Sequence, residues 1–154
     1  MSNILEKIVN QKKIDLLSVK KKYTNNLLTS LIKQNKSYIN FKNRIANNIK
    51  QNKISVIAEI KKASPSAGLI IKQYNPIAIA ENYILNGATC LSILTEEKFF
   101  LGDLQHITDV KNKYKIPILC KDFFIDSYQV PLAKSFGADA ILIILSGVDN
   151  KLAM

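Results

Sequence analysis

An apolar run turns abruptly charged in the stretch Val56-Ile57-Ala58-Glu59-Ile60-Lys61-Lys62-Ala63-Ser64-Pro65-Ser66. The apolar part is typical of a buried strand. Glu59 and Lys61 are two residues apart, so their side chains project from the same face of an extended chain, and Lys62 projects from the other. We therefore expect a carboxylate and an ammonium group together at the carboxyl end of this strand. A stiff loop should follow, because Pro65 fixes its own φ and favours an extended conformation at Ser64.

Strand and helix patterns alternate on the C-terminal side of this stretch. Apolar runs predict strands over 54–60, 88–94, 116–120 and 138–145, and helical spacing predicts helices over 77–85, 104–113 and 127–136. The expected N-caps are Asn75, Asp103 and Asp126, and the expected C-caps are Gly87 and Gly137. Short strands without polar alternation are typical of a parallel sheet covered on both faces. The order predicts an α/β fold in which right-handed crossovers join the strands.

The N-terminal segment and the bulk properties set further limits. Helices are predicted over 4–22, 25–34 and 41–49, and the 154 residues suffice for one ordinary domain. No apolar run approaches the roughly 20 residues of a membrane helix, and the N-terminus lacks the apolar core of a secretory signal. We therefore expect a cytoplasmic protein without a membrane partner. Cys90 and Cys120 lie in separate apolar runs, which indicates buried reduced thiols and no disulfide or metal site.

The net charge of +10 comes almost entirely from lysine, with Arg44 as the only arginine. Nucleic-acid recognition usually recruits arginine, and the lysines are spread along the N-terminal third without forming one basic block. We therefore expect no nucleic-acid partner and an attraction to small anionic molecules. His106 is the only histidine and falls in a predicted surface helix, so chemistry based on imidazole is not expected.

Polar side chains follow the predicted strands at their carboxyl ends, where parallel α/β folds bind ligands. The first three strands are followed there by Glu59, Lys61 and Ser64, by Thr95, Glu96 and Lys98, and by Lys121 and Asp122. Lys61 and Lys121 emerge directly from apolar strands, and a lysine in such surroundings binds an anion strongly or gives up a proton. We expect these two lysines to leave neighbouring strands on the same rim and face a common cavity. Phe99, Phe100 and Phe123 flank this rim and suit an aromatic substrate.

Three segments, 57–66, 91–102 and 117–126, resemble motifs of the indole-3-glycerol phosphate synthase family of tryptophan biosynthesis. Two further segments, 4–9 and 137–142, also fit the family. All five segments occur in the order expected for it. The resemblance implies an α/β fold, a TIM (β/α)8 barrel with an N-terminal helical extension. This chain then contains the extension over residues 1–50 and a partial barrel with the first four strands over 51–154.

The same resemblance implies a lyase that closes an indole ring. Its substrate is 1-(2-carboxyphenylamino)-1-deoxyribulose 5-phosphate, a carboxylate- and phosphate-bearing anion that loses carbon dioxide and water without a cofactor or metal. Lys121 resembles the general acid that protonates the ribulose carbonyl. Lys61 resembles the lysine that holds the substrate carboxylate and assists proton transfer, and Glu59 resembles its orienting partner. The other implied substrate contacts are Ser64 for substrate anions and Phe100, Phe123 and Leu142 for the anthranilate pocket.

The chain ends at Met154, just after its fourth predicted strand, whereas a (β/α)8 barrel needs about 250 residues. The family's fifth-strand glutamate and later phosphate loops have no counterpart, and residues 146–154 depart from its fourth helix. We interpret the chain as a truncated product or fragment with little or no activity alone, whose open sheet edges favour self-association. The alternatives are a non-catalytic half barrel that keeps only anion binding, and a related phosphate-binding barrel such as phosphoribosylanthranilate isomerase. The Glu59-Ile60-Lys61 and Lys121-Asp122-Phe123 motifs disfavour the isomerase.

Overall fold

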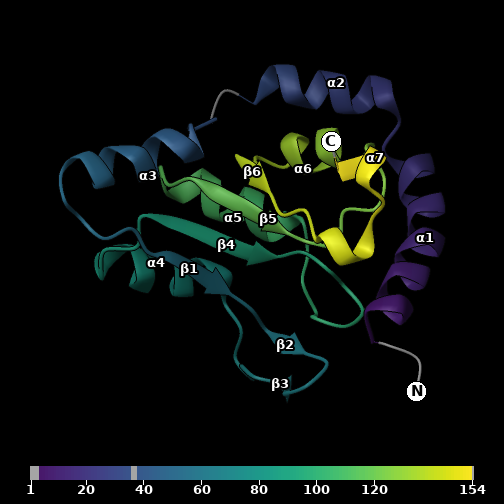
Figure 1. Ribbon diagram of the computed structural model, residues 1–154, viewed down its shortest axis with the longest axis horizontal. Helices are drawn as coiled ribbons and strands as arrows, with labels where there is room; N and C mark the ends of the chain where they lie inside the picture. The colour runs from purple at the N-terminus through teal and green to yellow at the C-terminus, as the bar shows by residue number, and fades with distance from the viewer. Residues whose placement is uncertain (1–3, 36–37, 154) are drawn as a thin grey trace.

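Helices come first along the chain, and a parallel sheet with further helices follows (Figure 1). The computed structural model describes residues 4–35 and 38–153. Its N-terminal helices are α1 (Ile4–Lys22), α2 (Asn25–Gln34) and α3 (Phe41–Lys50), within one residue of the predicted bounds. In this part of the chain no helix combines the length and the apolar character needed to cross a membrane. The division into an extension over 1–50 and a partial barrel over 51–154 stays a prediction.

The main sheet is parallel and has the strand order β1-β4-β5-β6. Its strands are β1 (Ile57–Ile60), β4 (Cys90–Leu94), β5 (Ile118–Lys121) and β6 (Ala140–Ile141), and the helices between them are α4 (Pro76–Leu85), α5 (Gln105–Lys113) and α6 (Gln129–Ser135). A small antiparallel hairpin, β2 (Ala63–Ser64) and β3 (Gly68–Leu69), follows β1, and a 3-10 helix η1 (Leu145–Gly147) and α7 (Asn150–Ala153) follow β6. This alternation confirms the predicted α/β fold and is consistent with part of a (β/α)8 barrel.

The side chains of the strands alternate between the two faces of the sheet, because successive residues of a strand point in opposite directions. One face forms the apolar core with the helices, through Ile60, Leu91, Ile93, Ile118 and Cys120 of the strands and Ala80, Ile107, Val110 and Ala133 of the helices. The other face carries Glu59, Ser92 and Leu119, which the register places beside one another. A polar site can therefore form on this second face without disturbing the core.

Asn75 is the N-cap of α4 as predicted. The predicted N-caps Asp103 and Asp126 are wrong, because α5 and α6 have Leu104 and Tyr128 at that position. Asn75 accepts hydrogen bonds from two backbone N–H groups in the first turn of α4. Gly87 and Gly137, after α4 and α6, have φ values of +86° and +102°, which glycine adopts without strain. Asp103 and Asp126 each accept a hydrogen bond from the N–H group two residues later, and α5 and α6 begin slightly later than predicted.

Two predicted segments differ from the structure. The strand predicted over 138–145 pairs with β5 only at Ala140–Ile141. After Ile141 the chain leaves the ladder and turns into η1. The loop predicted at Ser64-Pro65-Ser66 forms part of the β2–β3 hairpin, in which the Ser64 hydroxyl oxygen accepts a hydrogen bond from the backbone N–H of Ala67 at 3.1 Å.

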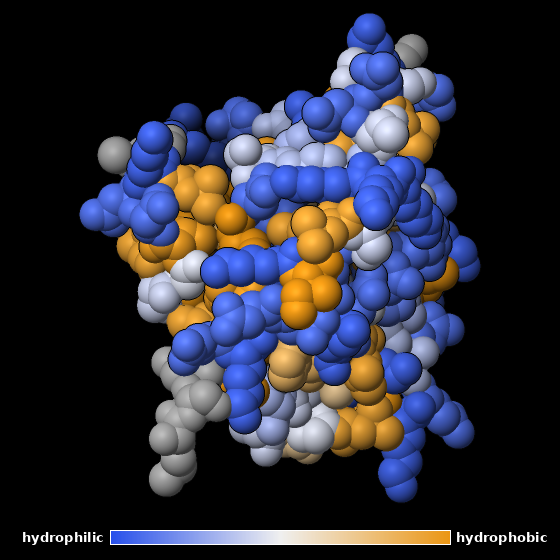
Figure 2. Space-filling model, turned by 90° about the vertical axis from the view of Figure 1, so that its right-hand side faces the viewer, coloured by the Kyte–Doolittle hydropathy of each residue, from blue (hydrophilic) through white to orange (hydrophobic). Residues whose placement is uncertain are grey.

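The surface on the α1 side of the molecule is mainly polar, with apolar patches between the charged side chains (Figure 2). Ile14 and Leu17 of α1 are 62% and 67% exposed. At the edge of the sheet, Val56 and Ile57 are 49% and 46% exposed. Large apolar side chains are thus left uncovered both on α1 and along β1.

His106 lies in α5, a helix with exposed residues as predicted, but its side chain is half-buried: the ring packs 5.3 Å from the Tyr74 ring, and Nδ1 is buried without a hydrogen-bond partner among the described residues. Burial lowers the pKa of His106, Asp103 and Asp109 oppose this effect, and Lys62 adds to it. With a folded pKa below the unfolded value, protonation favours the unfolded chain. We expect the free energy of unfolding to fall as the pH drops below about 6.5, and urea unfolding between about pH 5 and 8 measures this. An equal slope in a His106→Gln variant would contradict the prediction.

Candidate active site

A single carboxylate joins the two lysines singled out in the sequence. Oε1 of Glu59 lies 2.6 Å from Nζ of Lys61, and Oε2 lies 2.8 Å from Nζ of Lys121. Glu59 belongs to β1, Lys61 follows β1 directly, and Lys121 is the last residue of β5. The three side chains are 32% to 33% exposed, so a dissolved molecule can reach both ammonium groups.

The prediction that the two lysines leave neighbouring strands is wrong, because β4 lies between β1 and β5. Alternate strands of a (β/α)8 barrel contribute side chains to the same interior layer. The residue of β4 in register with Glu59 is Ser92, a small residue on the same face of the sheet. Lys121 therefore reaches over the intervening strand to the carboxylate of Glu59.

The ion triplet keeps Glu59 charged. Burial acts to raise the pKa of Glu59, but the hydrogen bonds and positive charges of Lys121 and Lys61 outweigh this effect and hold the pKa below its usual value. At neutral pH the triplet carries two positive charges and one negative charge. The remaining positive charge favours an anionic ligand.

The predicted substrate contacts are arranged unevenly. The rings of Phe100 and Phe123 are 6.0 Å apart and tilted by 40°. Leu142 follows β6 by one residue and continues the register that places β6 beside β5, at the level of Lys121. Ser64 has its hydrogen bonds within its own hairpin. The structure thus pairs the two phenylalanines, places Leu142 at the end of the strand beside β5, and holds Ser64 by hydrogen bonds within the β2–β3 hairpin.

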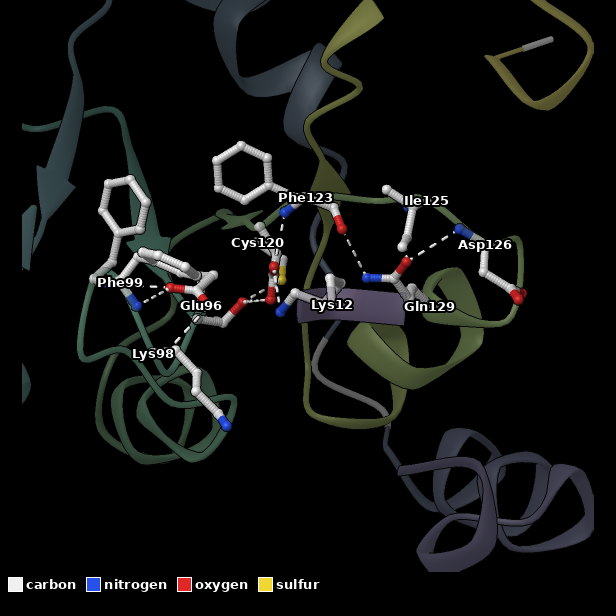
Figure 3. A network of polar contacts seen from close by, with 12 residues as sticks. Lys12, Glu96, Lys98, Phe99, Cys120, Phe123, Ile125, Asp126 and Gln129 are labelled. Carbon is white, nitrogen blue, oxygen red and sulfur yellow. Dashed lines mark hydrogen bonds and ion pairs between the residues drawn. The ribbon is translucent and has the colours of Figure 1, made fainter. Parts of the chain in front are cut away.

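A buried polar network lies next to Lys121 (Figure 3), and of its members the sequence pointed to Thr95 and Asp122 but not to Lys12. Asp122 accepts hydrogen bonds from Nζ of Lys12 at 2.7 Å and from Oγ1 of Thr95 at 2.9 Å, and Asp122 and Thr95 are only 8% and 2% exposed. Lys12 belongs to α1, so the N-terminal helix is tied to the residue that follows Lys121. No local signal separates Lys12 from the other lysines of α1, because the contact depends on how this helix packs.

In the loop after β4, the backbone of Gly102 packs closely against the backbone at the end of β4. A Cβ atom at this position would clash with the carbonyl oxygen of Leu94. We expect Gly102→Ala to lower the free energy of unfolding by about 1–3 kcal/mol, because the loop must move away from the strand. Gly147→Ala is the matched control, since its Cβ would meet neighbours only at 3.7 and 3.8 Å. Urea unfolding compares the two variants, and equal stabilities would contradict the expectation.

The arrangement suits an organic anion with an aromatic ring. An ammonium group holds a carboxylate by charge and hydrogen bonds, and it can donate a proton to an oxygen on which negative charge develops. The pair of phenylalanine rings offers an apolar surface to a planar group. Within residues 4–35 and 38–153, no three His, Cys, Asp or Glu side chains come together as metal ligands would.

Comparison with known proteins adds the decisive observation: the model of the family described as indole-3-glycerol phosphate synthase matches residues 5–154. The chain belongs to this family. Proteins named indole-3-glycerol phosphate synthase from Alkaliphilus metalliredigens and Aliarcobacter butzleri are 42% and 38% identical to it over 148 residues, which is 96% of this chain and 56% of each relative. One from Trichodesmium erythraeum is 48% identical over 91 residues, 59% of this chain and 31% of that relative.

The family match confirms the resemblance drawn from the three sequence motifs. The chain spans about half the length of the curated relatives that it matches over most of its own length. The residues that it shares with the family model include β1, β4, β5 and β6, and the ion triplet lies at the ends of two of these strands, β1 and β5.

Proposed function

We propose that this chain supplies the β1-to-β6 part of an indole-3-glycerol phosphate synthase, which converts 1-(2-carboxyphenylamino)-1-deoxyribulose 5-phosphate to indole-3-glycerol phosphate in tryptophan biosynthesis. The observation that carries the proposal is the carboxylate of Glu59 shared by Lys61 and Lys121 at 2.6 and 2.8 Å. These are the residues that the family resemblance assigns to catalysis. The two ammonium groups face one accessible region, as a substrate with both a carboxylate and a carbonyl requires.

Lys121 acts as the general acid in this proposal. The aromatic carbon that bears the carboxylate attacks the ribulose carbonyl carbon, and Lys121 protonates the carbonyl oxygen as the new bond forms. Loss of carbon dioxide and then of water, which carries away that oxygen, completes the indole ring. The hydrogen bond to Oε2 of Glu59, 2.8 Å long, orients the ammonium group of Lys121. General acid catalysis of this kind accelerates a reaction by about 10²- to 10⁴-fold.

The other residues hold the substrate. Lys61 binds the substrate carboxylate and assists the later proton transfer. Phe100, Phe123 and Leu142 line the pocket for the aromatic ring, and an apolar wall favours decarboxylation because it removes water from the carboxylate. Ser64 accepts the N–H of the hairpin turn, so its own O–H can donate to a substrate anion.

The proposed setting is the cytoplasm, with a small anionic substrate and no nucleic-acid or membrane partner. Cys90 and Cys120 are free and buried. Burial raises the pKa of Cys90 to about 11 and that of Cys120 to about 12. Both groups therefore remain thiols at neutral pH, which suits a reducing compartment.

A turnover assay tests the proposed function. The chain is assayed alone and together with the C-terminal half of the Alkaliphilus metalliredigens relative, after gel filtration has shown that the two parts form a complex. We expect little or no indole-3-glycerol phosphate from the chain alone and clear turnover from the complemented enzyme. A folded complex without turnover would contradict the proposal.

Self-association through the open sheet is a second candidate function, in which the half barrel binds anions without catalysis. At the β1 edge, Ile54, Val56 and Ile57 are 89%, 49% and 46% exposed. An open parallel edge flanked by apolar side chains pairs readily with another chain. Gel filtration with light scattering is expected to show a dimer or larger species, and a compact monomer over the whole concentration range would contradict this.

A further inference from the structure

A buried carboxylate that the proposed chemistry does not use lies in the loop after β4. Glu96 is only 1% exposed, and the ion pairs among the described residues do not include it. Burial of a charged group is strongly unfavourable unless hydrogen bonds or an opposite charge compensate for it. The loop itself must therefore stabilise this carboxylate.

Backbone N–H groups of the loop provide that stabilisation (Figure 3). Oε1 of Glu96 accepts a hydrogen bond from the N–H of Lys98 at 3.1 Å, and Oε2 accepts from those of Phe99 and Phe100 at 2.6 and 3.0 Å. The backbone carbonyl of Glu96 accepts a further hydrogen bond from Gly102 at 2.7 Å. Successive N–H groups converge on this carboxylate as they do on a bound anion in a backbone nest.

The loop adopts a conformation that needs such support. Leu101 has a φ of +52°, a left-handed conformation that is unfavourable for a residue with a side chain. Gly102 lies so close to the carbonyl oxygen of Leu94 that a Cβ atom would not fit. Hydrogen bonds to a charged acceptor are stronger than those between neutral groups, so the Glu96 carboxylate can hold the loop in this shape.

We propose that Glu96 is a positioning residue that fixes the Phe100 ring against Phe123. Phe100 donates the last N–H of the nest to Glu96, and its ring lies 6.0 Å from the Phe123 ring. The carboxylate thereby fixes the position of the aromatic wall, the pair of rings of Phe100 and Phe123 that is proposed to contact the aromatic ring of the substrate. This assignment of the wall rests on the proposed function, whereas the placement of the Phe100 ring does not depend on turnover.

Glu96→Gln tests the inference, with Glu97→Gln at the exposed neighbouring residue as the matched control. Glutamine has the same length, but its NH₂ group cannot accept the N–H donors that one carboxylate oxygen accepts. We expect Glu96→Gln to lose the nuclear Overhauser contact between the rings of Phe100 and Phe123. In the complemented enzyme we expect KM to rise about tenfold with little change in kcat, because the wall binds substrate without taking part in bond making. Glu97→Gln should change neither.

An unchanged ring contact in a folded Glu96→Gln variant would overturn the inference, and so would a lost contact with an unchanged KM. If Glu96→Gln does not fold, the rate of amide hydrogen exchange in the unsubstituted chain tests whether the loop is bound to Glu96. The N–H groups of Phe99 and Phe100 must then exchange slowly, and exchange at the rate of an unstructured peptide would overturn the inference. An inactive complemented enzyme would contradict the proposed function, while the ring contact and the exchange rates still decide the role of Glu96.

Discussion

Replacing Lys121 with methionine is expected to lower kcat of the complemented enzyme by about 10²- to 10⁴-fold. Methionine keeps most of the length of the side chain but cannot donate a proton, and it leaves the Glu59 carboxylate with Lys61 alone. Because the proton is transferred in the transition state, kcat and kcat/KM should fall by similar factors. Steady-state measurement of indole-3-glycerol phosphate formation gives both quantities.

Two further lysine variants make this result specific. Lys113→Met removes an exposed lysine from the last turn of α5 and should leave both constants unchanged. Lys61→Met should raise KM, because Lys61 is proposed to hold the substrate carboxylate, and should lower kcat less than Lys121→Met, because Lys61 is proposed to assist only the later proton transfer. A Lys121→Met enzyme that turns over as fast as the Lys113→Met enzyme would show that another group donates the proton.

Replacing Asp139 with asparagine is expected to lower the free energy of unfolding by about 3–5 kcal/mol. Asp139 lies 2.5 Å from Nζ of Lys111, and the two side chains are 0% and 4% exposed. The Asp139 carboxylate also accepts hydrogen bonds from the backbone N–H groups of Ile39 at 2.7 Å and Ile118 at 2.8 Å. A neutral side chain there would remove the negative charge of the buried ion pair between Asp139 and Lys111.

Urea unfolding of matched variants checks this expectation. Asp126→Asn removes the charge from an ion pair with Lys20 whose side chains are 35% and 42% exposed, and it should cost at most about 1 kcal/mol. The double variant Lys111→Met/Asp139→Asn should be more stable than Asp139→Asn alone, because it removes both charges of the buried pair. An Asp139→Asn variant as stable as Asp126→Asn would contradict the prediction.

Patterns within a few residues of one another predicted most of the fold. The apolar runs located β1, β4 and β5, and Asn75 with Pro76 marked the start of α4. The spacing of Glu59 and Lys61 predicted that their side chains share a face, and they are 2.6 Å apart. Such features follow from backbone geometry, so neighbouring residues are enough to predict them.

Contacts between distant segments were not predictable in this way. Lys12 and Asp122, Lys111 and Asp139, and His106 and Tyr74 each meet through the packing of separate elements. The short length of β6 was not predictable either, since the residues of the predicted strand are as apolar as those of the longer strands.

The linear order of residues was sufficient to establish an α/β chain of the indole-3-glycerol phosphate synthase family with charged groups at the carboxyl ends of its strands. Folding in three dimensions was needed to bring Lys121 over β4 to the carboxylate of Glu59, 62 residues earlier in the chain, and to wrap the loop after β4 around Glu96. The physical reason is that residues close together in the sequence determine which face of a strand a side chain occupies and where a helix is capped. The curvature of the sheet and the burial of a charge depend on every element packed around them.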